Sequence, residues 1–131
     1  MRRLLTVMLL LSVATGIAHA ADRVGPGQKF AVFFQEWSAR LDNPAQSVIS
    51  HAAEYAKAHS GQVVHVAGFA DPTGSRKANT LLADLRMQVV VDQLEKYGVP
   101  ASHIAGRGHG AVHFALSSQE SRRVEVGFGS R

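Results

Sequence analysis

The fold of this chain is decided by one stretch, Val63-Val64-His65-Val66-Ala67-Gly68-Phe69-Ala70-Asp71-Pro72-Thr73-Gly74, and by the helical pattern that follows it. Residues 63–69 form a nearly continuous apolar run, which is typical of a strand that is buried on both faces. Pro72-Thr73-Gly74 then breaks the run. Asp71, at the end of this predicted strand, is the first residue that we single out for function.

The residues after this break predict a long helix from about Ser75 to Tyr97. Arg86 lies about 60° from Ala83 around this helix, at the edge of its packed stripe, and Asn79 lies about 40° from Ala83 on the same side. Polar and charged side chains occupy the opposite face, which supports a helical period. The apolar stripe, spaced 4, 3 and 4 residues apart, consists of Ala83, Met87, Val90 and Leu94.

The flanking segments complete one predicted domain. A second helix is expected to begin with Asn43 as N-cap and Pro44 as its first helical residue, and to end at a C-cap glycine, Gly61. Residues 35–41 fit no element clearly. The remaining strands are expected at residues 29–34, 103–107 and 122–128. The order is β-α-β-α-β-β, an α+β domain in which both helices pack on one face of a mixed sheet as a two-layer sandwich.

The first twenty residues predict a secretory signal peptide. Arg2 and Arg3 form a basic start, residues 4–13 an apolar run, and Ala18-His19-Ala20 a small-residue cleavage signature. The alternative is a membrane anchor, but the apolar run is short for a membrane span. We therefore expect a signal peptide at 1–20, a short extension at 21–28 and one domain at 29–128, with no membrane span after cleavage.

Composition and charge limit the classes of function. The chain of 131 residues contains no cysteine, so it has no thiol for a disulfide or a lipid anchor. Without Arg2 and Arg3, twelve basic residues face ten acidic ones, a net charge of +2. An exported chain of this charge is not expected to bind nucleic acid. The sequence shows no nucleophile with a positioned base, no carboxylate pair and no phosphate-binding glycine loop, so we expect neither enzymatic activity nor a cofactor.

Three histidines raise the question of a metal site. His109 and His113 have the His-x3-His spacing that binds zinc on a helix, and His103 is nearby in sequence. Gly108 and Gly110 are unfavourable in a helix, and no further ligand is obvious. We therefore expect no metal site here.

Asp71 and Arg86 offer the chemistry of a binding site. A carboxylate and a guanidinium brought together can hold a zwitterion, because the first binds its ammonium group and the second binds its carboxylate by two parallel hydrogen bonds. Each residue also has a simpler explanation. Asp71 precedes Pro-Thr-Gly and can make a turn or cap the next helix, and Arg86 can cover apolar surface with its stem. The residues alone leave these explanations open.

Together these segments resemble the OmpA-like peptidoglycan-binding domain family. Its strand-end motif Gly-(His/Tyr)-Thr-Asp-x-x-Gly corresponds to residues 68–74, and its terminal motif Asn-Arg-Arg-Val-Glu to residues 121–125. The resemblance covers about residues 29–128. The sequence departs from the family at Ala70, which replaces a threonine, and at Ser121, which replaces an asparagine. The family's helix motif, Asn-x2-Leu-Ser-x2-Arg-Ala-x2-Val-x3-Leu, is matched at Asn79, Leu82, Arg86, Val90 and Leu94.

The resemblance implies that Asp71 and Arg86 bind the zwitterionic end of the diaminopimelate residue in the peptidoglycan stem peptide. Asn79, Arg122 and Arg123 are implied to belong to the same ligand site. We expect the charged ends of Asp71 and Arg86 to lie about 4 to 8 Å apart, with both residues partly exposed in a groove.

The implied role is non-covalent binding of peptidoglycan in the periplasm, with the protein at the cell wall or the outer membrane. The alternative is an envelope adaptor of the same fold that binds another protein instead of the cell wall. The departures at Ala70 and Ser121 are what favour this alternative.

Overall fold

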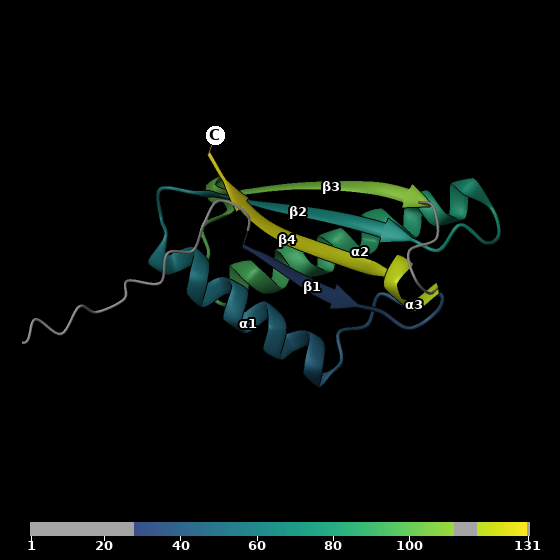
Figure 1. The fold of residues 1–131 in the computed structure, drawn as a ribbon, viewed down its shortest axis with the longest axis horizontal. Coiled ribbons are helices and arrows are strands. Elements are labelled where there is room, and N and C mark those ends of the chain that lie inside the picture. The colour runs from purple at the N-terminus through teal and green to yellow at the C-terminus, as the bar shows by residue number, and fades with distance from the viewer. Residues whose placement is uncertain (1–27, 112–117, 131) are drawn as a thin grey trace, which may run out of the picture.

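Four strands form one mixed sheet in the computed structural model, which describes residues 28–111 and 118–130 (Figure 1). The order across the sheet is β1-β4-β2-β3, in which β4 is antiparallel to both β1 and β2, and β2 is parallel to β3. The strands are β1 (Lys29–Phe33), β2 (Val63–Ala70), β3 (Ile104–Ala111) and β4 (Arg123–Gly129).

Two long helices cover one face of this sheet (Figure 1). α1 (Asn43–Ala58) packs on β1, and α2 (Arg76–Lys96) packs on β2 and β3. A 3-10 turn, Ala101–His103, leads into β3, and a four-residue helix, α3 (Ser118–Ser121), precedes β4. Residues of β4 alternate between buried and half-buried, as expected where only one face of the sheet is covered. The predicted α+β class and two-layer arrangement are therefore confirmed.

The ends of several elements differ from the prediction. The N-cap of α1 is Asp42 rather than Asn43, because the Asp42 side chain accepts a hydrogen bond from the Ala45 amide at 2.8 Å. The helix ends at Ala58 and its C-cap is His59 rather than Gly61; the His59 ring stacks on Tyr55 with centroids 4.0 Å apart.

β3 also differs, since it runs on to Ala111 instead of ending near Arg107. Its pairing with β2 continues past Gly68 through a register shift, and this pairing holds the longer strand in place. The short helix α3 was not expected, and β4 begins at Arg123, one residue later than predicted.

Glycines on β2 and β3 let α2 approach the sheet closely. A Cβ built on Gly68 would lie 2.2 Å from the Ala83 carbonyl oxygen, and one on Gly106 would lie 2.5 Å from the Met87 sulfur. Side chains at these positions would push the helix away from the strands. The backbone contact therefore fixes the position of α2 relative to the end of β2, where Asp71 follows.

The buried stripe of α2 contains two polar residues. Ala83, Val90 and Leu94 are fully buried, as predicted, but Asn79 and Arg86 are buried beside them. Met87 packs against the core only in part. Buried polar side chains are costly unless they have partners, so the partners of Asn79 and Arg86 indicate what these residues do.

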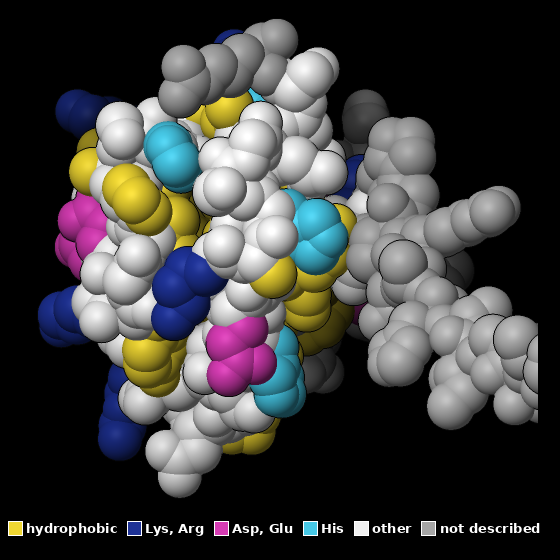
Figure 2. Space-filling model, turned by 90° about the vertical axis from the view of Figure 1, so that its left-hand side faces the viewer, with side chains coloured by type: hydrophobic (Ala, Val, Ile, Leu, Met, Phe, Trp, Pro, Cys, Tyr) yellow, Lys and Arg dark blue, Asp and Glu magenta, His cyan; other side chains and the backbone are white. Residues whose placement is uncertain are grey.

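Figure 2 shows the end of the domain at which β2 and β3 begin, seen from the left-hand side of Figure 1. Basic, acidic, histidine and apolar side chains are interspersed on this face.

Neither long helix in the described part of the chain has an apolar stretch that could cross a bilayer. The predicted signal peptide at residues 1–20, residues 21–27 of the extension, and His113 lie outside the described residues.

Candidate binding site

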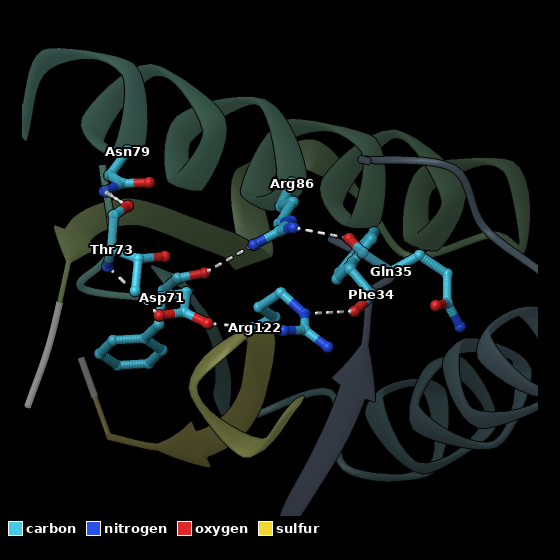
Figure 3. Close-up of polar contacts among 8 residues, drawn as sticks. Phe34, Gln35, Asp71, Thr73, Asn79, Arg86 and Arg122 are labelled. Carbon is cyan, nitrogen blue, oxygen red and sulfur yellow. Dashed lines mark hydrogen bonds and ion pairs between the residues drawn. The ribbon is translucent and has the colours of Figure 1, made fainter. Parts of the chain in front are cut away.

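Four of the five predicted site residues meet at the opposite end of the sheet, where β1 and β2 end and β4 begins (Figure 3). Here the β1–α1 loop, the β2–α2 loop and the first half of α2 surround a small cleft. Its volume is only about 10 Å³, at the lower limit for one water molecule. The cleft is lined by Glu36, Trp37, Asp71, Thr73, Asn79, Leu82, Arg86 and Arg122.

Arg86 reaches from α2 into the β1–α1 loop. Its Nε donates to the Ser38 carbonyl at 2.8 Å and its Nη2 donates to the Gln35 carbonyl at 2.9 Å. Nη1 donates to the carbonyl of Phe69, on β2, at 3.4 Å, and the guanidinium also lies over the Phe34 ring, 5.2 Å from its centroid. Figure 3 shows the side chain directed away from α2 toward these carbonyls. Arg86 therefore joins α2, β2 and the loop after β1.

Arg86 is fully buried, with a relative exposure of 0%. The expectation that it would be partly exposed in a groove is wrong, because main-chain carbonyls and the loop after β1 enclose its guanidinium. Burial lowers the pKa of Arg86 to about 10; Arg122 contributes to the decrease and Asp71 opposes it. The side chain therefore stays charged at neutral pH, and it is close enough to both residues to interact with their charges.

Asp71 follows β2 directly and is 8% exposed. Its Oδ1 accepts a hydrogen bond from the Thr73 amide at 3.2 Å, which is the turn role considered for it from the sequence. Its Oδ2 lies 3.4 Å from Nη1 of Arg122. Asp71 thus has a local structural role and also presents a carboxylate at the cleft. The N-cap of α2 is a different residue, Ser75.

Arg122 and Asn79 hold the walls of the cleft. Arg122 Nε donates to the Phe34 carbonyl at 3.2 Å, so this arginine connects the start of β4 to the end of β1 as well as to Asp71. Asn79 Nδ2 donates to the Thr73 carbonyl at 2.8 Å, which ties the β2–α2 loop to the first turn of α2. Both residues were selected from the sequence, and both line the cleft.

Arg123 lies apart from this group. Its guanidinium sits over the Phe69 ring, 4.4 Å from the centroid, and donates to Glu125 at 3.0 Å and to the Glu120 carbonyl at 2.9 Å. It is not among the residues that line the cleft. The structure therefore brings together four of the five selected residues, namely Asp71, Arg86, Asn79 and Arg122.

His109 lies on β3 rather than on a helix, and its ring stacks on Phe69 with centroids 4.9 Å apart. Within residues 28–111 and 118–130, no three histidine, cysteine, aspartate or glutamate residues are grouped to hold a metal ion. His113, the other half of the His-x3-His pair, is outside these ranges.

Sequence reasoning missed the contribution of the β1–α1 loop. Glu36 and Trp37 line the cleft, and the carbonyls of Gln35 and Ser38 accept hydrogen bonds from Arg86. Residues 35–41 follow neither a helical nor a strand pattern, so no periodic signal marked them. A lone tryptophan within such a segment was the one feature that could have drawn attention to it.

Comparison with known proteins shows which family the chain belongs to. The model of the OmpA family matches residues 33–125, and the chain belongs to this family. It is 38% identical over 96 residues to outer membrane protein 40 of Porphyromonas gingivalis, covering 72% of this chain and 25% of that protein. It is 33% identical over 85 residues to the peptidoglycan-binding protein ArfA of Mycobacterium bovis, covering 60% of this chain and 26% of that protein. The chain thus spans about a quarter of the length of these relatives.

A solved structure confirms the fold. The peptidoglycan-associated lipoprotein of Burkholderia pseudomallei superposes with a TM-score of 0.72 at 23% identity, covering 83% of this chain and 98% of that one.

Proposed function

We propose that this chain binds peptidoglycan non-covalently in the periplasm, through the zwitterionic end of diaminopimelate in the stem peptide. Membership of the OmpA family and a relative named as a peptidoglycan-binding protein support the class of ligand. The names of relatives also support a place at the outer membrane or the cell wall. The role is binding rather than catalysis.

The observation that carries the proposal is the Asp71 carboxylate beside two guanidinium groups in a single cleft, which Glu36 also lines. Asp71 offers a carboxylate for the ligand's ammonium group, and Arg86 and Arg122 offer N–H groups for its carboxylate. The bonds from Arg86 to Phe69 and Gln35 use one N–H on each terminal nitrogen, so the second N–H of each can donate to a ligand. A ligand with both charges on one carbon matches this arrangement.

Binding to two kinds of purified sacculi tests the proposal. The protein from residue 21 onward should sediment with sacculi whose stem peptides contain diaminopimelate. It should bind sacculi containing lysine at that position at least about tenfold more weakly, because lysine lacks the second carboxylate for the two arginines. Equal sedimentation with both, or with neither, would contradict the proposed ligand.

The second candidate is an adaptor that binds an envelope protein. It is supported by Leu81 and Leu85, which are 61% and 53% exposed on adjacent turns of α2. Such side chains occur at protein interfaces, although isolated exposed leucines are also common. Failure to sediment with either kind of sacculi would favour this candidate, and Leu81→Ala with Leu85→Ala should then abolish capture of the partner.

A further inference from the structure

The β1–α1 loop contains a tight turn that Arg86 holds at both ends. Within the turn, the Ser38 amide donates to the Gln35 carbonyl at 3.2 Å. Arg86 donates to the carbonyls of the same two residues, at 2.8 Å to Ser38 and 2.9 Å to Gln35. The position of this turn therefore depends on the arginine that we propose to bind the ligand's carboxylate.

Trp37 occupies the third position of this turn in an unfavourable backbone conformation. Its φ is 53°, in the left-handed region that glycine and asparagine usually fill in turns. Among the residues that the structure describes, it alone combines a positive φ with a side chain. A bulky residue in this conformation has a modest energetic cost, so the turn is less stable than one with glycine.

The Trp37 indole extends across the cleft to the β2–α2 loop. A Cβ built on Gly74 would lie 3.0 Å from Cη2 of Trp37, so the ring packs directly against this glycine. Trp37 and the β2–α2 loop residue Thr73 both line the cleft. Trp37 nevertheless remains 56% exposed to solvent.

The closed cleft is too small for the proposed ligand. Its volume of about 10 Å³ does not hold an amino-acid carbon with its ammonium and carboxylate groups, and Arg86 beneath it is fully buried. Something must move before a ligand can reach Arg86. The side chain that is both exposed and held by a strained turn is Trp37.

We propose that Trp37 is a gate, which closes the cleft in the free protein and leaves Gly74 when ligand binds. This inference rests on the proposed function and explains how a ligand reaches the proposed binding site. A ligand carboxylate that accepts from the second N–H groups of the two terminal nitrogens shares the Arg86 guanidinium with the Gln35 and Ser38 carbonyls and weakens the bonds to them. When these bonds weaken, the turn is released and the indole moves away from Gly74. Binding at Arg86 and opening of the gate are thus one coupled event.

A ligand-free experiment tests the gate first. Phenylglyoxal modifies accessible arginines, and peptide mass spectrometry gives the rate at each site. In the wild type, Arg86 should react far more slowly than the exposed Arg40. Trp37→Ala should raise the Arg86 rate at least about tenfold, as expected if the open state is a minor population. Leu81→Ala, which removes a similarly exposed apolar side chain outside the cleft, should leave the Arg86 rate unchanged. An unchanged Arg86 rate in Trp37→Ala would overturn the gate.

A second experiment uses the emission of Trp37, the sole tryptophan of the chain. The probe is a soluble muropeptide that contains a diaminopimelate-terminated tripeptide. Saturating probe should move the emission to longer wavelength and increase quenching by acrylamide, because the indole leaves Gly74. Binding detected by calorimetry without any change in emission would overturn the gate. If neither the wild type nor Trp37→Ala binds the probe, the proposed ligand is wrong, and the arginine modification rates still decide whether the gate exists.

Discussion

Oδ2 of Asp71 lies 3.4 Å from Nη1 of Arg122, so the aspartate is already paired with one arginine at the cleft where Arg86 lies. Its other oxygen, Oδ1, accepts from the Thr73 amide. An ionised carboxylate offers about four acceptor positions, so two remain for an ammonium group. The cleft therefore presents the Asp71 carboxylate paired with Arg122, with Arg86 and Glu36 also in its lining. Asp71, Arg86 and Arg122 each also bond to main-chain atoms of the surrounding loops and strands. Replacing any of them should therefore change stability as well as binding.

Arg122 and its neighbour Arg123 form a matched pair for mutation. Arg122→Gln removes a guanidinium that lines the cleft and should weaken binding to diaminopimelate sacculi about tenfold, the loss expected for one charged hydrogen bond. Arg123→Gln removes a guanidinium that lies over Phe69 and should change affinity less than about threefold. Sedimentation isotherms measure both. A larger effect at Arg123 would mean that the ligand site extends toward Phe69.

Arg86→Lys should lose both binding and stability. Lysine keeps the charge but cannot donate from a planar fork to the carbonyls of Gln35, Ser38 and Phe69 together. Weakening this buried network should cost about 3 kcal/mol or more of unfolding free energy, which corresponds to a fall in melting temperature of about 10 °C or more. Calorimetry measures the stability and sedimentation the binding. If the lysine variant were as stable as the wild type, the hydrogen bonds from the planar guanidinium to the three carbonyls would not contribute to stability.

The approach of α2 to β2 can be tested at a glycine. Gly68→Ala places a Cβ against the backbone carbonyl of Ala83, which cannot move aside. We expect a loss of about 1 to 3 kcal/mol in unfolding free energy, and weaker sacculus binding because α2 carries Arg86. Gly61→Ala is the control, since its Cβ would meet nothing within 4 Å. Urea unfolding should show the Gly68 loss alone, and equal stabilities would contradict the close packing.

The elements of the fold were predictable because their patterns are local. The apolar run of β2 and the 4-3-4 stripe of α2 were identified directly from the sequence. Helix ends were less certain, because Asp42 and Asn43 are both good N-caps and only the side-chain bond to Ala45 distinguishes them. The burial of Arg86 was underestimated, since periodicity places a residue on a face but says nothing of the loop that covers it.

The site was predictable only in part. Asp71 and Arg122 are 51 residues apart in the sequence, and no spacing rule brings them together. Trp37 carries no turn signal, because the left-handed position that it occupies is normally marked by glycine or asparagine. Both features arise from tertiary contacts at the ends of β1, β2 and β4.

Asp71→Asn separates the ligand role of this residue from its structural role. Asparagine is nearly isosteric and can still accept from the Thr73 amide, so the turn after β2 should persist. The ion pair with Arg122 is lost, which should lower the unfolding free energy by about 1 to 2 kcal/mol. The negative charge for the ligand's ammonium group is lost as well.

The most direct test is therefore the affinity of Asp71→Asn for diaminopimelate sacculi, measured beside the wild type at a temperature well below both melting transitions. If Asp71 binds the ammonium group, affinity should fall at least about tenfold although the variant remains folded. Binding by the asparagine variant equal to that of the wild type would contradict the zwitterion site.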